Sequence, residues 1–297
     1  MEIYRTACLV AKSNFMRWKK DGRILLTFLL MIVLMIRYFS GLSSFGIKYH
    51  TKITPFLLSV VFADCDITNG LLKILVCFGW VCLLCDVPVR DPFLTYIVLR
   101  SGRKGWWLGE NIYICASAFG YTVFLSVIPA LILLPSVSLH EFWGSTITQI
   151  LKSDEYQVLY LGNLVLPRRV ISIIYPYGAQ ILGFLAVWLQ FWFLGMVMYS
   201  INFCCKSNTL GIAAAVFLIL LDPVVVYCGA SMTTKWMYRF SPVNWSSIEN
   251  WTIVGQTQPV SMTYAYGMYA IMIGIGMFWT RWRCIKEDIR VDESAGV

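Results

Sequence analysis

Six stretches of the chain are apolar over about the length that a helix needs to cross a bilayer. They fall near residues 24–45, 67–86, 109–135, 178–203, 210–229 and 263–281. The hydrocarbon core of a bilayer is about 30 Å thick, which takes roughly 20 helical residues. Because lipid offers no hydrogen-bond partners, the backbone of such stretches must satisfy itself, as it does in a helix. The pattern predicts an all-α polytopic membrane protein with six transmembrane helices.

The composition agrees with this fold class. Of the 297 residues, 58% are hydrophobic and 13% are charged, and the mean hydropathy is +0.68. Soluble domains carry about 45–50% apolar and about 25% charged residues. The formal net charge of +8 does not indicate nucleic-acid binding here, since basic residues of a membrane chain hold its topology and meet anionic lipid.

The distribution of lysine and arginine predicts the orientation. With the N-terminus inside, the inner segments hold fifteen of these residues and the outer segments hold seven. Cytoplasmic segments carry the excess of positive charge in membrane proteins. Both termini are therefore expected in the cytoplasm of a cell whose plasma membrane the chain crosses.

Residues 1–23 are expected to form an amphipathic helix at the cytoplasmic interface. Its apolar stripe consists of Tyr4, Ala7, Cys8, Ala11, Phe15 and Trp18. The opposite face carries Arg5, Lys12, Ser13, Arg17 and Lys20. Helices with this division lie in the plane of the interface. A soluble coil would leave the apolar stripe in water.

Residues 282–297 are expected to form a cytoplasmic tail. Two of the expected outer segments are long. Residues 136–177 show helical spacing of apolar residues, and structureless loops of this length are uncommon. We expect a helical cap there, between spans 1–3 (24–135) and spans 4–6 (178–281). Residues 230–262, rich in tryptophan, are expected to form a second cap or a re-entrant piece.

Residues 91–103, between the second and third spans, are expected to form a short cytoplasmic helix. Asp91 is a suitable N-cap, Pro92 fits the first helical position, and Gly102 is a natural stop. The helix is too short to cross a membrane, yet it carries Phe93 and Tyr96. An exposed apolar surface of this kind indicates a docking site for a protein partner, with lying flat on the inner leaflet as the alternative.

The chain lacks the residue patterns of a catalytic or nucleotide-binding protein. No H-E-x-x-H, G-x-S-x-G or G-x-x-x-x-G-K-[ST] sequence occurs, and the two histidines, His50 and His140, have no metal spacing. The chain is therefore not expected to be an enzyme or to hold a metal or cofactor. Any energy for work would come from another subunit.

The stretch "RDPFLTYIVLRSGRKGWWLGENIY" at residues 90–113, with the amphipathic start and six spans, resembles the type-2 permease family, the membrane subunits of bacterial ABC transporters. The resemblance implies that Asp91 through Arg103, including Pro92, Phe93, Tyr96 and Arg100, form a coupling helix. That helix would sit in a separate ATPase subunit, which would bind the ATP and magnesium. Glu110 would brace the loop by pairing with Arg100, Arg103 or Lys104.

The resemblance also implies two permease copies, more readily identical than different, with the substrate path between them. The outer cap resembles those of exporters of amphipathic peptides such as toxins, phenol-soluble modulins and antimicrobial peptides. An exporter of lipid or drug is an alternative. A stand-alone secondary transporter or channel is the alternative from another class of protein.

Three charged residues fall inside the predicted spans, namely Arg37, Lys73 and Asp222. A charge within the bilayer is costly and usually faces a cavity or a partner. All three lie at comparable depth toward the outer end, so we expect Asp222 to pair with Lys73 or Arg37, near Pro223. Snorkelling toward the interface is the alternative, and it suits Arg37 better than the short Asp222.

Overall fold

The computed structural model describes residues 2–63, 71–88, 94–139, 142–162, 164–229, 235–252, 258 and 260–286. The long helices are α1 (Glu2–Trp18), α2 (Gly22–Lys48), α4 (Leu72–Leu84), α5 (Leu94–Ile132), α9 (Pro176–Cys205), α10 (Asn208–Cys228) and α11 (Met262–Lys286). The short ones are α3 (Leu58–Val61), η1 (Leu134–Ser136), α6 (Ser145–Lys152), α7 (Asp154–Tyr156), η2 (Gln157–Leu161), α8 (Arg168–Ile173), η3 (Lys235–Phe240), η4 (Asn244–Ser246) and η5 (Ile248–Asn250). These residues include no β-strand, so the predicted all-α class is confirmed for this part of the chain.

Four helices are long and apolar enough to cross a membrane. They are α2, α5 from Tyr96 onward, α9 and α10. The shortest, α10, has 21 residues and covers roughly 30 Å at about 1.5 Å per residue. The four coincide with the first, third, fourth and fifth predicted spans. The chain is therefore a helical membrane protein.

The other two predicted spans differ from the expectation. In the described residues the second is α4, whose 13 residues cover only about 20 Å, less than the hydrocarbon core. The sixth is α11, which has 25 residues but does not reach the hydropathy of the four spans. The tyrosines and glycines of α11 lower its hydropathy. Six spans stay a prediction for these two segments.

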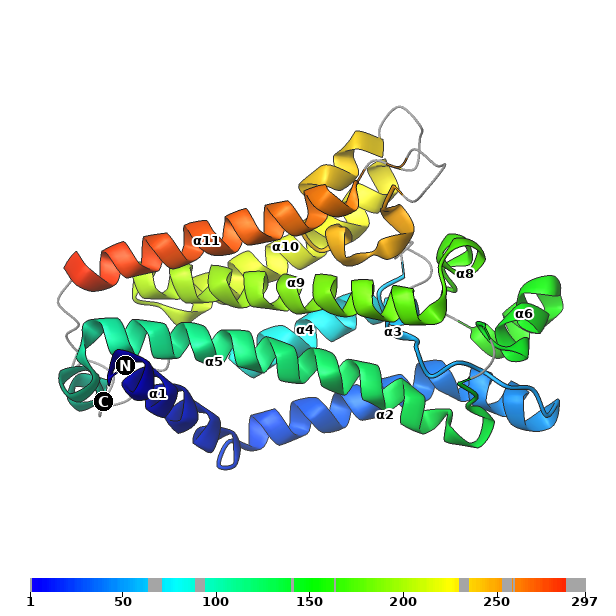
Figure 1. Cartoon of the computed structure of the whole chain (residues 1–297), viewed down its shortest axis with the longest axis horizontal. Coiled ribbons are helices and arrows are strands. Elements are labelled where there is room, and N and C mark those ends of the chain that lie inside the picture. Colours follow the sequence, from blue (N-terminus) through cyan, green and yellow to red (C-terminus); the bar gives the residue numbers. More distant parts are fainter. Residues whose placement is uncertain are drawn as a thin grey trace.

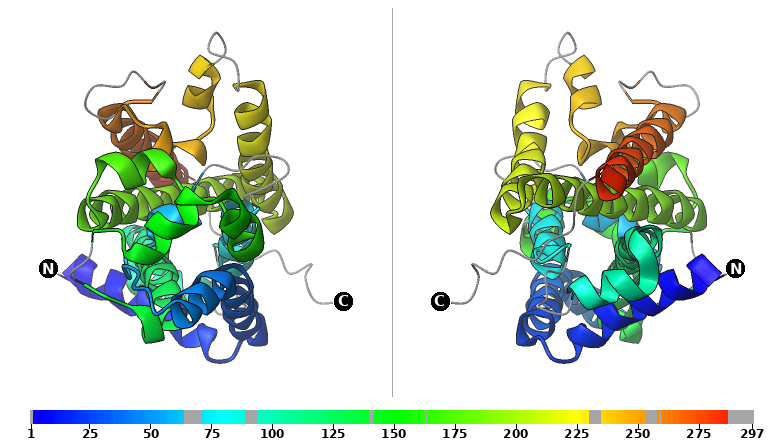
Figure 2. Two further views of the ribbon diagram at one scale, coloured as in Figure 1. Left: turned by 90° about the vertical axis from the view of Figure 1, so that its right-hand side faces the viewer. Right: turned by 90° about the vertical axis from the view of Figure 1, so that its left-hand side faces the viewer.

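The long helices run side by side along the longest axis of the molecule (Figure 1). The start of α1 and the last turn of α11 lie at one end, and α6 and α8 lie at the opposite end (Figure 1). End-on, α2 lies on one side of the bundle and α10 and α11 on the other, with α9 between them (Figure 2). In its most apolar stretch α9 is 56% buried, against 28% for α2 and for α10, so α9 is the central helix.

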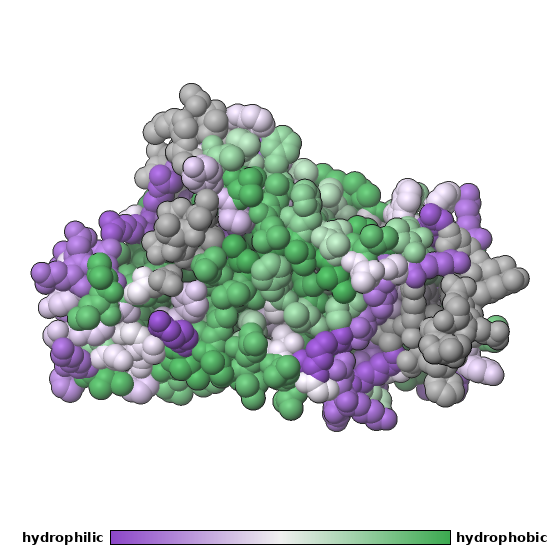
Figure 3. Space-filling view, turned by 180° about the vertical axis from the view of Figure 1, so that it is seen from behind, coloured by the Kyte–Doolittle hydropathy of each residue, from purple (hydrophilic) through white to green (hydrophobic). Residues whose placement is uncertain are grey.

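The outer surface of the bundle matches a membrane environment. Apolar side chains form a band across the middle of one face, and polar side chains gather toward its two ends (Figure 3). Exposed leucine, isoleucine and valine residues line α2, and α10 adds further exposed apolar residues. In water such a surface would drive aggregation, whereas hydrocarbon solvates it.

Aromatic packing joins the three inner helices. The ring of Trp80 on α4 stacks on Tyr121 of α5 with 5.7 Å between centroids, and lies 5.3 Å from Phe191 of α9. The hydroxyl of Tyr121 donates a hydrogen bond to the carbonyl of Val76, 2.9 Å away. All three rings are buried. This cluster holds α4, α5 and α9 together at mid-bundle.

Helix α1 packs against α5 through a face that overlaps the predicted stripe. Ala7 and Ala11 of that stripe are buried, and Phe15 and Trp18 are partly buried against the core. Val10 and Asn14 are buried on the same face. Tyr4 and Cys8, which belong to the predicted stripe, are exposed. The contact face follows the i, i+3, i+4, i+7 spacing. The face includes Val10 and Asn14, which lie outside the predicted stripe, because both side chains contact residues of α5.

Replacing Trp80 with alanine is expected to lower the free energy of unfolding by about 3–5 kcal/mol, since it opens a cavity among three helices. Thermal unfolding in mild detergent measures the loss. The matched control is Trp236→Ala, which removes an exposed indole. Equal unfolding temperatures for the two variants would contradict the aromatic cluster as a core.

Candidate functional site

Lys73 and Asp222 form an ion pair inside the bundle, with 2.7 Å between Nζ and Oδ2. Lys73 lies at the start of α4 and Asp222 near the end of α10, two helices that pack against each other. Both side chains are 0% exposed. Burying two charges is costly, and their attraction offsets the cost only with good geometry and further hydrogen bonds.

Two serines supply those hydrogen bonds. Ser241 Oγ donates to Asp222 Oδ1 at 3.0 Å, and Lys73 Nζ donates to Ser247 Oγ at 3.0 Å. Both serines are completely buried and flank η4. The segment from η3 to η5 is thereby fastened over the ion pair. Tyr269 of α11 adds a further tie by donating to the carbonyl of Pro242 at 2.6 Å.

The structure thus contains one of the two pairings that the sequence left open. Arg37, the other possible partner of Asp222, is exposed. The hydrogen bonds of Ser241 and Ser247 to the ion pair could not be predicted from the sequence. Both serines lie outside the predicted spans, in a segment whose position depends on how the bundle folds. Pro223 directly follows Asp222 within α10, where a proline removes one backbone hydrogen bond.

At the opposite end, α5 bends at Gly102. This residue has φ 72° and ψ 153°, a conformation that glycine adopts readily and other residues avoid. The bend separates a short helix, residues 94–101, from the rest of α5. Tyr96 and Leu99 on this short helix are 71% and 77% exposed. Asp91, Pro92 and Phe93 lie outside the described residues.

Buried contacts tie the short helix to its neighbours. Val98 packs with Val10 of α1, Trp106 of α5 and Cys284 of α11. Across the bend, Arg103 Nη1 donates to the carbonyl of Ile285 at 3.0 Å. A cavity of about 350 Å³ lies beside the short helix. It is lined by Thr6, Leu9, Val10, Ser13, Ile97, Arg100 and Ser101.

Glu110 does not brace the loop as expected. Its Oε1 accepts a hydrogen bond from Asn14 Nδ2 of α1 at 2.9 Å, and its side chain is buried. Within the described residues, the partner of Glu110 is this asparagine and not Arg100, Arg103 or Lys104. The expected partners are near Glu110 in sequence. In the folded chain α1 packs along α5, and this places Asn14 beside Glu110. Glu110 therefore fastens α1 to α5.

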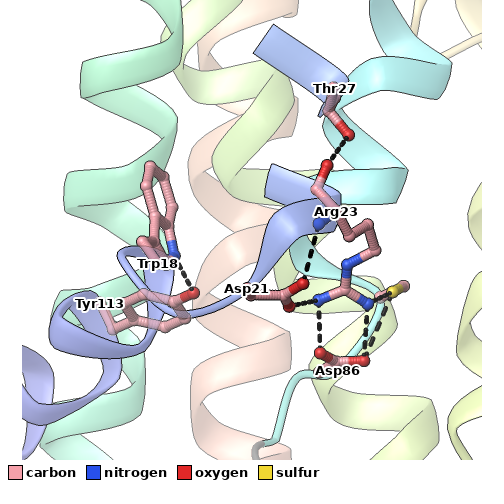
Figure 4. A network of polar contacts seen from close by, with 7 residues as sticks. Trp18, Asp21, Arg23, Thr27, Asp86 and Tyr113 are labelled. Atoms are coloured by element: carbon pink, nitrogen blue, oxygen red, sulfur yellow. Dashed lines mark hydrogen bonds and ion pairs between the residues drawn. The ribbon is translucent and has the colours of Figure 1, made fainter. Parts of the chain in front are cut away.

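A charged network joins the start of α2 to the end of α4 (Figure 4). Arg23 binds Asp21 at 2.8 Å and both carboxylate oxygens of Asp86, and it also contacts the sulfur of Cys85. The hydrogen bond from Arg23 lowers the pKa of Asp86 below its ordinary value. Next to it, Trp18 Nε1 donates to the hydroxyl of Tyr113 at 2.8 Å. No pairing of Arg23, Asp21 and Asp86 was predicted, although these charges of opposite sign border two predicted spans.

The residues that the structure describes contain no group of three histidine, cysteine, aspartate or glutamate side chains that could hold a metal ion. Comparison of the chain with protein-family models, with curated proteins and with solved structures finds no match in any of the three. Function is therefore inferred from the residues and their geometry.

Asp222→Asn is expected to lower the free energy of unfolding by about 3–5 kcal/mol, because it leaves the charge of Lys73 buried and unpaired. Thermal unfolding in mild detergent, followed by tryptophan fluorescence, measures it. The double variant Lys73→Met, Asp222→Leu removes both charges and should recover most of the loss. Arg37→Gln is the control, since Arg37 is exposed. If Asp222→Asn were as stable as Arg37→Gln, the ion pair would have no role in stability.

Lowering the pH is expected to weaken the junction at Arg23. The folded pKa of Asp86 lies below its unfolded value, so its contribution is present at neutral pH. That contribution is lost as the pH falls through and below about 4. Unfolding temperatures measured between neutral and acidic pH should fall less steeply for Asp86→Asn than for the unchanged chain. Asp154→Asn, at the other end of the bundle, should follow the unchanged chain.

Proposed function

We propose that this chain is the membrane subunit of a bacterial ABC exporter that works with a separate ATPase subunit. It would cross the plasma membrane six times, with both termini in the cytoplasm, and two copies would enclose the path of the substrate. ATP and magnesium would bind to the partner. The chain itself would carry out no chemistry.

The single observation that carries this proposal is the short helix that precedes Gly102. Two large side chains, Tyr96 and Leu99, point away from the bundle on a helix of about two turns. Burying each against a protein would contribute about 1.5–3 kcal/mol. Arg100, also exposed on this helix, can form charge-assisted hydrogen bonds to a partner. Such a helix suits a groove in another protein.

The contacts of the short helix offer a route by which a partner could move the bundle. Val98 is packed into a cluster with α1, α5 and α11, and Glu110 fastens α1 to the third predicted span. A push on the short helix would therefore shift α1 together with the inner ends of two predicted spans. Closure of an ATPase dimer would supply that push.

The apolar character of the spans and the short helices at the end that we propose to be the outer one support a proposed substrate class. Together they suit an amphipathic molecule, with toxin-like, modulin-like or antimicrobial peptides first and lipid or drug next. If a purified complex hydrolyses ATP, an amphipathic helical peptide should stimulate it more than a detergent-matched lipid does. Stimulation by lipid alone would reassign the substrate.

The double variant Tyr96→Asp, Leu99→Asp is expected to lose an ATPase subunit that co-purifies with the intact chain from the native membrane in mild detergent. The recovered amount should fall at least tenfold, since two apolar contacts worth about 1.5–3 kcal/mol each are replaced by buried charges. Quantitative mass spectrometry of the eluted complex measures it.

The control is Val158→Asp, Leu159→Asp, which changes two comparably exposed side chains, 81% and 71%, at the other end of the bundle. It should retain the ATPase. If the intact chain brings down no ATPase, the short helix lies on lipid instead. The stand-alone transporter then becomes the function to test.

A further inference from the structure

An apolar groove of about 440 Å³ lies between α5, α9 and α11. Residues that form its walls include Leu108, Ala116, Phe119, Trp188, Trp192 and Met277. The rings of Trp188 and Trp192 stack 6.0 Å apart, and Phe119 meets Trp188 edge-on at 5.8 Å. Two of the three helices, α5 and α9, are long and apolar enough to cross a membrane. The groove therefore faces hydrocarbon, and its occupant must be apolar over most of its length.

Two polar atoms in the lining have no hydrogen-bond partner within the part of the chain that the structure describes. They are Asn111 Oδ1 and Trp192 Nε1. Asn111 is only 3% exposed, and its amide nitrogen already donates to the carbonyl of Trp107 at 2.7 Å. An unpaired donor or acceptor in an apolar environment is costly. Both atoms are covered by the protein itself, so the groove offers its occupant an apolar surface.

A cation stands at one end of the groove. Arg281 follows Met277 by one helical turn, and its guanidinium lies 5.8 Å from the ring centroid of Trp107. Trp107 directly precedes Leu108, and its indole donates to Thr280 Oγ1 at 3.0 Å. Arg281 is exposed, and no carboxylate of the described residues forms an ion pair with it. Arg281 is not a lining residue, but it places a cation one turn beyond the apolar walls.

We propose that this groove binds an anionic phospholipid from the leaflet at the end where α5 begins and α11 ends. One acyl chain would lie along Phe119, Trp188 and Met277, with the phosphate on Arg281. Basic pockets between transmembrane helices bind lipid head groups on the cytoplasmic side, and Trp107 beside Arg281 fits the preference of tryptophan for the level of the head groups. The site does not require an ATPase, so its failure would leave the proposed function untouched.

The test is lipid retention by the full chain in phosphatidylcholine nanodiscs that contain a minor fraction of phosphatidylglycerol. Native mass spectrometry after release into detergent shows which lipid stays bound. The intact chain should retain phosphatidylglycerol in preference. Arg281→Gln should weaken this retention about five-fold, the equivalent of about 1 kcal/mol for one basic residue near the head groups.

Lys286→Gln is the matched control. Lys286 is an exposed cation on the same helix end and stands 4.3 Å from the ring of Trp282, but it follows Met277 of the groove by more than two helical turns, against one turn for Arg281. Its replacement should leave retention unchanged. Equal effects of the two substitutions, or equal retention of phosphatidylcholine, would overturn the site, because either result shows non-specific attraction or none.

Two further variants test the walls of the groove. Ala116→Phe should fill the groove and expel the lipid, while Trp192→Phe keeps an aromatic wall and should leave retention unchanged. Unchanged unfolding temperatures show that each variant folds. Unchanged retention in a folded Ala116→Phe variant would refute the proposal. A change of oligomeric state instead would show that a second copy of the chain covers this groove.

Discussion

The buried ion pair of Lys73 and Asp222 is the constraint on which the end of the bundle where α4 begins and α10 ends depends. Two charges excluded from water must neutralise each other and must fill their remaining hydrogen-bonding capacity. The second requirement brings in Ser241 and Ser247, and with them the whole segment from η3 to η5. Through Tyr269 the same segment holds α11. One electrostatic requirement therefore determines how α4, α10 and a loop far away in sequence are assembled.

The buried ion pair and the Arg23 network lie toward opposite ends of the molecule, with a buried aromatic cluster between them. At the end opposite the ion pair, Glu110 joins α1 to α5 and Arg23 joins α2 to α4. Between them, Trp80, Tyr121 and Phe191 pack without charge. This division suits a bilayer, because hydrocarbon contributes nothing to packing between helices while polar groups near the ends retain access to partners.

The proposed functions use different parts of this architecture. Coupling to an ATPase would use the short helix before Gly102, whose inner side is packed by Val98 and whose outer side presents Tyr96 and Leu99. Lipid binding would use a groove that begins near Arg281, on the last turns of α11. Both sites involve α5 and α11 near the same end of the bundle. A bound lipid could therefore bias the position of the helices that an ATPase would move.

The sequence by itself determined the elements whose cause is local. Apolar length predicted the four helices that can cross a membrane. Gly102 marked the end of the short helix because only glycine adopts its backbone conformation readily. Because a buried charge needs a partner of opposite sign, the expected partner of Asp222 was either Lys73 or Arg37. Only the tertiary structure showed that Asp222 pairs with Lys73 and not with Arg37. It also showed that Glu110 accepts from Asn14 instead of pairing with a nearby basic residue, and that Ser241 and Ser247 bind the ion pair. These contacts join residues far apart in the chain, and their distances depend on how the helices pack.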